Sequence, residues 1–224
     1  MMRFMRKLHK WVGLVIALQV ILWAVSGVMF AWLDHSKVSA ADSVHSVEPA
    51  VLVPAAVRSE PTAWLADYAR QDLYDVRAIS LAERWVWRVE LQDRVELRAI
   101  DDGSPVKLDE GWVRQLARAR YAGGGALIAT TLQSQPDLES RAKGPVWRAQ
   151  FDDPQNTALY FAADDGRFIV ARTASWRLYD FFWMLHTMDY VGRDNFNNPL
   201  IVTIGMAALW LSISGIVLLT RSFR

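Results

Sequence analysis

The sequence contains no cysteine among its 224 residues. This absence excludes disulfide bonds, iron–sulfur clusters ligated by cysteine and covalently attached c-type haem. Any redox cofactor of this protein must therefore be held without thiols.

Charge is absent from two long stretches, Trp11–Leu33 with 23 residues and Pro199–Thr220 with 22. A helix needs about 20 apolar residues to cross a bilayer, so both stretches are predicted to span a membrane. The N-terminal stretch is longer than the apolar region of a signal peptide, which has about 7–15 residues. We therefore expect it to be retained rather than cleaved near residues 38–40.

Acidic residues are missing from both ends of the chain, and all 24 lie between residues 34 and 194. Basic residues stand at positions 3, 6, 7 and 10, before the first apolar stretch, and at 221 and 224, after the second. Because loops rich in Lys and Arg stay in the cytoplasm, both termini are predicted to be cytoplasmic. The middle then lies outside the cytoplasm, in the periplasm if the protein comes from a Gram-negative bacterium, and we expect the protein in a bacterial inner (plasma) membrane. Its mildly acidic balance argues against nucleic acid as a partner.

One pattern occurs twice between the two apolar stretches. Residues 84–103 and 144–166 each contain Val-Trp-Arg, a polar turn, a second alternating strand and Asp-Asp-Gly. The Val-Trp-Arg triplets begin 60 residues apart, and the Asp-Asp-Gly triplets begin 63 apart. Such regular separation indicates a duplicated unit.

Each copy is predicted to contain a helix followed by antiparallel strands. The helices are expected at 61–71 and 109–121. Strands are expected at 76–82, 85–91 and 95–100 in the first copy and at 126–132, 146–151, 157–163 and 168–172 in the second. Asp-Asp-Gly is interpreted as a turn rather than as a set of oxygen ligands for ferric iron.

The sequence therefore predicts an α+β membrane protein. Its segments are a cytoplasmic basic N-terminus (1–10), a first transmembrane helix (11–33), a periplasmic tether (34–60), a first repeat (61–107), a second repeat (108–173), an aromatic amphipathic segment leading into the membrane (174–198), a second transmembrane helix (199–220) and a cytoplasmic C-terminus (221–224).

Several motifs resemble those of the PepSY-associated transmembrane family. The first span opens with RKLHKWVG at residues 6–13 and continues into WAVSG at 23–27. The second is preceded by LHTMDY at 185–190 and FNNP at 196–199. The helix-plus-meander repeat is similar to the PepSY domain, here in tandem, so the resemblance covers nearly the whole chain.

The resemblance implies a function as well as a fold. Larger members of the family resemble haem-containing inner-membrane reductases that deliver electrons to periplasmic ferric iron or ferric siderophores. We therefore expect a haem b-containing electron-transfer protein with ferric iron or a ferric chelate as acceptor and substrate, that is, a ferric reductase. Quinol, a flavin reductase and a partner subunit all remain open as the electron donor, and no flavin or nicotinamide fingerprint is present.

A non-enzymatic function is the alternative. Isolated PepSY domains are associated with protease inhibition, and larger family members carry four or more spans where this chain carries two. In this alternative, the tandem domain binds or regulates a partner transporter or protease, and the histidines are structural.

The histidines are the candidate haem ligands, because neutral imidazole suits the axial positions of haem iron. His9 precedes the first span and His186 precedes the second, so the predicted topology puts them on opposite sides of the membrane. The first span alone covers about 34 Å at about 1.5 Å per residue, which prevents these two side chains from sharing one iron. His35, at the outer end of the first span, is a further candidate that could pair with His186.

Two helices are too few to enclose a haem, since bundles place such cofactors between several facing helices. A homodimer would supply four, and its twofold axis would set His9 opposite its copy and His186 opposite its copy. The expected content is two b-type haems per homodimer. Asp189 and Arg193 are candidates to hydrogen-bond a histidine or a haem propionate. The alternative is that the basic cluster and the aromatic segment only anchor the chain at the lipid interface.

Overall fold

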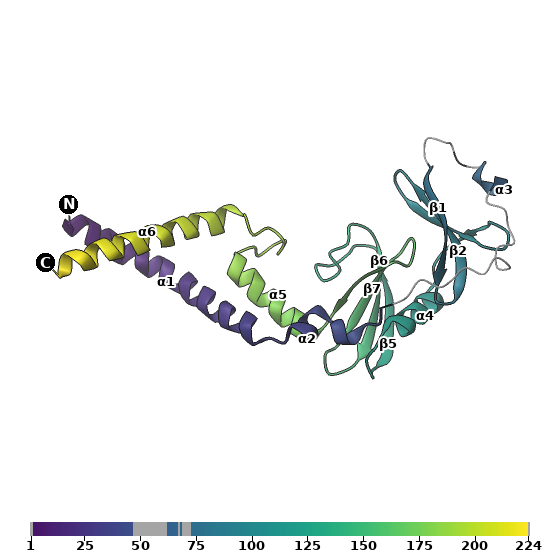
Figure 1. Ribbon diagram of the computed structural model, residues 1–224, viewed down its shortest axis with the longest axis horizontal. Helices are drawn as coiled ribbons and strands as arrows, with labels where there is room; N and C mark the ends of the chain where they lie inside the picture. Colours follow the sequence, from purple (N-terminus) through teal and green to yellow (C-terminus); the bar gives the residue numbers. More distant parts are fainter. Residues whose placement is uncertain (1, 47–61, 67, 69–72, 224) are drawn as a thin grey trace. The chain divides into compact units, whose positions relative to one another are not determined.

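The computed structural model describes residues 2–46, 62–66, 68 and 73–223, which form two compact units (Figure 1). The membrane unit contains the chain up to Asp34 and again from Ser175. The two-sheet unit contains the described part of His35–Ala174. The predicted α+β membrane architecture is confirmed, because apolar terminal helices flank a middle region built from two antiparallel sheets.

The membrane unit consists of three helices. They are α1 (Met2–Trp32), α5 (Ala174–Thr187) and α6 (Pro199–Ser222). Both α1 and α6 are long and apolar enough to cross a membrane, with mean hydropathies of 2.3 and 2.2. Because α1 already begins at Met2, the basic residues before the first uncharged stretch belong to the same helix as the stretch itself.

The second membrane helix starts with the cap that FNNP predicts. The side chain of Asn198 accepts hydrogen bonds from the backbone N–H groups of Leu200 and Ile201, each at 3.1 Å. Pro199 takes the first helical position, where its missing N–H removes no helical bond.

Each repeat forms a four-stranded antiparallel sheet in sequential order. The first sheet contains β1 (Leu73–Leu81), β2 (Arg84–Leu91), β3 (Val95–Ala99) and β4 (Pro105–Val106). The second contains β5 (Ala126–Gln133), β6 (Val146–Asp152), β7 (Ala158–Ala162) and β8 (Phe168–Arg172). All seven predicted strands are present, and β4 is an additional strand.

The helices of the repeats differ in length. In the first repeat α3 covers only Thr62–Leu65 of the predicted 61–71, of which residues 61, 67 and 69–71 lie outside the described residues. In the second repeat α4 (Glu110–Arg120) confirms the predicted helix, and the side chain of Asp109 caps it by accepting from Trp112 N at 2.7 Å. The predicted tether contains α2 (His35–Ser39) and the 3-10 helix η1 (Ala41–Ser43), whereas residues 47–60 lie outside the described part.

One hydrophobic core joins the two repeats. Helix α4 contributes Trp112, Val113 and Leu116 to it. Buried side chains from both sheets complete it, among them Leu81, Val86, Leu97, Phe151, Leu159 and Phe161. The indole N–H of Trp112 donates to the Leu81 carbonyl at 2.9 Å, so the helix of the second repeat is also bonded to the first sheet.

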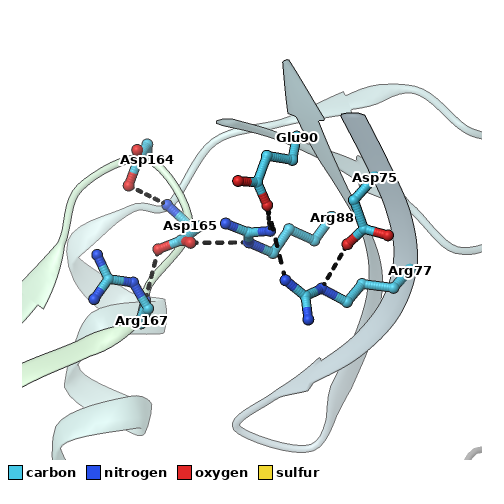
Figure 2. A network of polar contacts seen from close by, with 7 residues as sticks. All are labelled: Asp75, Arg77, Arg88, Glu90, Asp164, Asp165 and Arg167. Atoms are coloured by element: carbon cyan, nitrogen blue, oxygen red, sulfur yellow. Dashed lines mark hydrogen bonds and ion pairs between the residues drawn. The ribbon is translucent and has the colours of Figure 1, made fainter. Parts of the chain in front are cut away.

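The Asp-Asp-Gly triplets are turns, as predicted. Gly103 and Gly166 have φ angles of 73° and 68°, in the left-handed region where glycine is least strained. In the second turn Asp165 also pairs with Arg88 of the first repeat, with 3.0 Å between Arg88 Nε and Asp165 Oδ2 (Figure 2). These side chains are only 13% and 4% exposed, so the repeats are joined by a nearly buried ion pair.

Candidate functional site

The membrane unit contains both histidines of the motifs, and the two-sheet unit contains the other two. His35 begins α2 and His45 follows η1, and both are exposed. The predicted pairing of His35 with His186 stays a prediction. The contacts that can be described around candidate ligands are therefore those of His9 and His186.

His9 contacts the C-terminal half of α6. Its Nδ1 atom is 2.7 Å from the hydroxyl oxygen of Ser214. The ring also lies 6.4 Å from that of Trp210, measured between centroids. Gly215 makes this approach possible, because a Cβ at that position would lie 3.3 Å from His9 Cε1.

His186 is held in the same way by the opposite half of the membrane unit. It lies near the end of α5, and its Nδ1 atom is 2.7 Å from the hydroxyl oxygen of Ser26 on α1. Its ring is 6.3 Å from Trp23 and 5.5 Å from Phe30. The indole N–H of Trp23 donates to the His186 carbonyl at 2.8 Å and fixes the backbone as well.

The serine hydroxyls indicate which nitrogen of each ring carries the proton. Each serine also bonds within its own helix, Ser26 to the Leu22 carbonyl at 2.7 Å and Ser214 to the Leu211 carbonyl at 3.0 Å. A hydroxyl has a single proton, and a carbonyl can only accept it. When that proton points to the carbonyl, the serine oxygen accepts from Nδ1–H of the histidine and the lone pair is left on Nε2.

Both histidines contact serines that lie well inside the uncharged stretches. Ser214 precedes the end of the uncharged stretch at Thr220 by six residues, about 9 Å at the helical rise. Ser26 precedes Leu33 by seven residues, or about 10 Å. His9 and Ser26 are separated by 17 residues of α1, about 26 Å, so one iron cannot reach both histidines of a single chain.

Asp189 and Arg193 organise the loop between α5 and α6. The Asp189 carboxylate accepts from the backbone N–H groups of residues 191, 192, 194 and 195 at 3.0–3.4 Å. The hydrogen bonds from these N–H groups lower the pKa of Asp189, and the bond from Asn195 has the largest effect. Arg193 Nη1 lies 2.5 Å from Asp180 Oδ2 of α5. These contacts hold the loop that follows His186, while a bond from either residue to a haem propionate stays a prediction.

The described residues contain no group of three or more His, Cys, Asp or Glu side chains that could hold a metal ion. The sequence motifs identified His9 and His186, but they gave Ser26 no role and did not include Ser214. The only signal for these serines is a hydroxyl placed within an otherwise apolar span.

Comparison with known proteins agrees with the motifs. The model of the family described as "PepSY-associated TM region" matches residues 2–222, nearly the full length of the chain. Neither the curated proteins nor the solved structures contain a significant match.

Proposed function

Because the chain belongs to the PepSY-associated transmembrane family, we propose that it is a haem b-containing electron-transfer protein. In this proposal it resides in the bacterial inner membrane with both termini in the cytoplasm. Its acceptor is ferric iron or a ferric chelate on the periplasmic side, where the two-sheet unit lies.

The observation that carries the proposal is the pair of histidine–serine bonds. Each imidazole is oriented through Nδ1, at 2.7 Å from a serine hydroxyl in both cases, and Nε2 carries the lone pair when Nδ1 is the protonated atom. Histidines that ligate metals commonly have their other ring nitrogen held by such a hydrogen bond, which fixes the tautomer and the ring orientation.

The surroundings of both rings fit an apolar cofactor. Trp23 and Phe30 flank His186, Trp210 flanks His9, and Gly215 places no side chain against Cε1 of the His9 ring. A bound b-type haem would supply one-electron redox chemistry. The protein would orient the ligand nitrogen and surround the site with apolar side chains.

Each half of the membrane unit offers one imidazole, and bis-histidine ligation needs two. A twofold dimer doubles both sets and brings four membrane helices together. We therefore propose a homodimer with two haems, one held by two copies of His9 and one by two copies of His186.

The test is the absorption spectrum and the haem content of the full-length protein purified from haem-supplemented cells. The proposal predicts a Soret band that shifts on addition of dithionite and about two haems per dimer. His9→Ala and His186→Ala should each remove about one haem, whereas His45→Ala, which changes an exposed histidine of the two-sheet unit, should remove none.

A folded, colourless protein would overturn the proposal and would favour the non-enzymatic alternative, a membrane-anchored module that binds or regulates a transporter or protease. Loss of all haem through His186→Ala alone, with His9→Ala unchanged, would contradict the two-haem arrangement.

A further inference from the structure

The two-sheet unit contains a pocket of about 610 Å³ beside the second sheet. One wall is the end of the long β5–β6 connection, residues 141–145. The other wall is the β7–β8 turn, from Ala163 to Arg167, together with Ile169. The volume falls within the range of about 300–1,000 Å³ that is typical of small-molecule sites.

The lining of the pocket combines a cationic rim with an apolar base. Arg141, Lys143 and Arg167 supply three basic side chains, against the single carboxylate of Asp164. Val146 and Ala162 are buried and contribute apolar surface. A positively charged rim above an apolar base suits an organic anion.

The β5–β6 connection is held firmly before any ligand binds. Asp137 accepts from Ser140 N at 2.8 Å and from the Tyr160 hydroxyl at 3.2 Å. Ser140 is only 1% exposed, and the carbonyl of Glu139 accepts from Arg172 Nε at 2.7 Å. Because these bonds tie the connection to β7 and β8, the wall is largely preformed.

The β7–β8 turn is held equally well. Asp164 Oδ1 accepts from Asp165 N at 2.8 Å, and Asp165 Oδ1 accepts from Arg167 N at 2.9 Å. Figure 2 shows the side chains of Asp164 and Arg167 on the side of Asp165 that faces away from Arg88. One turn thus joins the two repeats through Asp165 and presents the two neighbouring charges to the pocket.

We propose that this pocket binds an organic anion that carries at least two carboxylates. A guanidinium fork matches a carboxylate in a bidentate manner, and a lysine ammonium supplies a second, less directional contact. The apolar base accommodates the hydrocarbon part of such a ligand. The Asp164 carboxylate can accept a hydrogen bond from a hydroxyl group of such a ligand. The site lies wholly within the two-sheet unit and does not depend on the haem proposal.

The test is isothermal titration calorimetry of the full-length protein in detergent, with citrate as the probe. Saturable binding is expected, and Lys143→Gln and Arg167→Gln should each weaken it about tenfold or more, which corresponds to about 1.4 kcal/mol. Arg118→Gln is the matched control, because it removes the same charge from the exposed surface of α4, outside the pocket.

Circular dichroism of each variant separates a loss of binding from a loss of folding. The proposal is overturned if the folded wild-type protein shows no saturable binding, or if Arg118→Gln weakens binding as much as Arg167→Gln does. It is also overturned if inorganic phosphate or acetate binds as tightly as citrate. None of these results would alter the spectrum on which the haem proposal depends.

Discussion

Each of the two membrane histidines depends on one serine hydroxyl for the orientation of its ring. The hydroxyl lies within hydrogen-bond distance of a carbonyl of its own helix and of Nδ1 of the histidine, so the ring is held by a chain of two hydrogen bonds. The serines were not predictable, because 160 and 205 residues separate them from their histidines along the chain. Hydrophobic periodicity contains no information about such a pairing.

Removal of either hydroxyl should weaken the haem held by the neighbouring histidine. Partners of metal-bound histidines typically account for 10–100-fold in affinity, so we expect that effect for Ser26→Ala and for Ser214→Ala in titrations with haemin. The matched control is Ser212→Ala, whose hydroxyl bonds only to the Ala208 carbonyl of its own helix among the described contacts. Equal affinities for all three variants would show that the serines do not orient the ligands.

The ion pair of Arg88 and Asp165 is the corresponding feature of the two-sheet unit. Arg88 belongs to the first Val-Trp-Arg triplet and Asp165 to the second Asp-Asp-Gly triplet. The ion pair therefore joins one motif of the first repeat to the other motif of the second repeat. The triplets predicted a turn and a strand correctly, but their contact depends on how the two repeats pack. Arg88 also bonds to Glu90 at 2.7 Å.

Asp165→Ala should destabilise the two-sheet unit by about 3 kcal/mol, because removing one member of a buried pair leaves the other charge buried. Asp93→Ala is the control, since Asp93 pairs with Arg94 at a site where their side chains are 74% and 55% exposed. Such surface pairs contribute at most about 1 kcal/mol. Denaturant unfolding followed by tryptophan fluorescence measures both, and equal losses would contradict the assignment of Arg88–Asp165 as the bond between the repeats.

At the scale of elements, α1 has two neighbours in succession. Its first half packs against α6, where His9 meets Ser214 and a Cβ at Gly13 would lie 3.7 Å from Leu211. Its second half packs against α5, with Phe30 4.8 Å from Tyr179 between ring centroids. The uncharged stretches predicted both spans. They could not show that each histidine would contact a serine within the apolar stretch of a facing helix.

The approach of His9 to α6 should depend on Gly215. Because a Cβ there would lie 3.3 Å from the imidazole, Gly215→Val should displace the ring and lower the haem content by about one per dimer. Gly205→Val on the same helix is the control, since nothing lies within 4 Å of a Cβ at that position. Haem content after purification provides the measurement, and full haem in the Gly215 variant would contradict the described contact.

The two sheets illustrate where sequence patterns succeed. Alternation of apolar residues predicted seven strands because each sheet has one face against the shared core. It missed β4, since Pro105 and Val106 are too few to alternate and proline is a poor strand residue. It also overestimated the extent of α3, whose described helix ends at Leu65.

At the scale of the whole molecule, internal duplication builds the two-sheet unit, and the proposed dimer completes the haem ligands of the membrane unit. The repeat gives the chain two sheets around one core, and the pocket and the inter-repeat ion pair both involve the second Asp-Asp-Gly turn. In the proposal, a second chain supplies the second ligand of each haem, because the described membrane unit offers one His9 and one His186.

The most direct test of this account is electron transfer across a membrane by the purified protein in liposomes. Ferric citrate is enclosed with a ferrous-iron indicator in vesicles whose protein has the two-sheet unit inside, and dithionite is added outside. The account predicts that ferrous iron forms inside at a rate that falls to the level of protein-free vesicles with either His9→Ala or His186→Ala. A wild-type rate equal to that of protein-free vesicles, or one that neither substitution lowers, would contradict it.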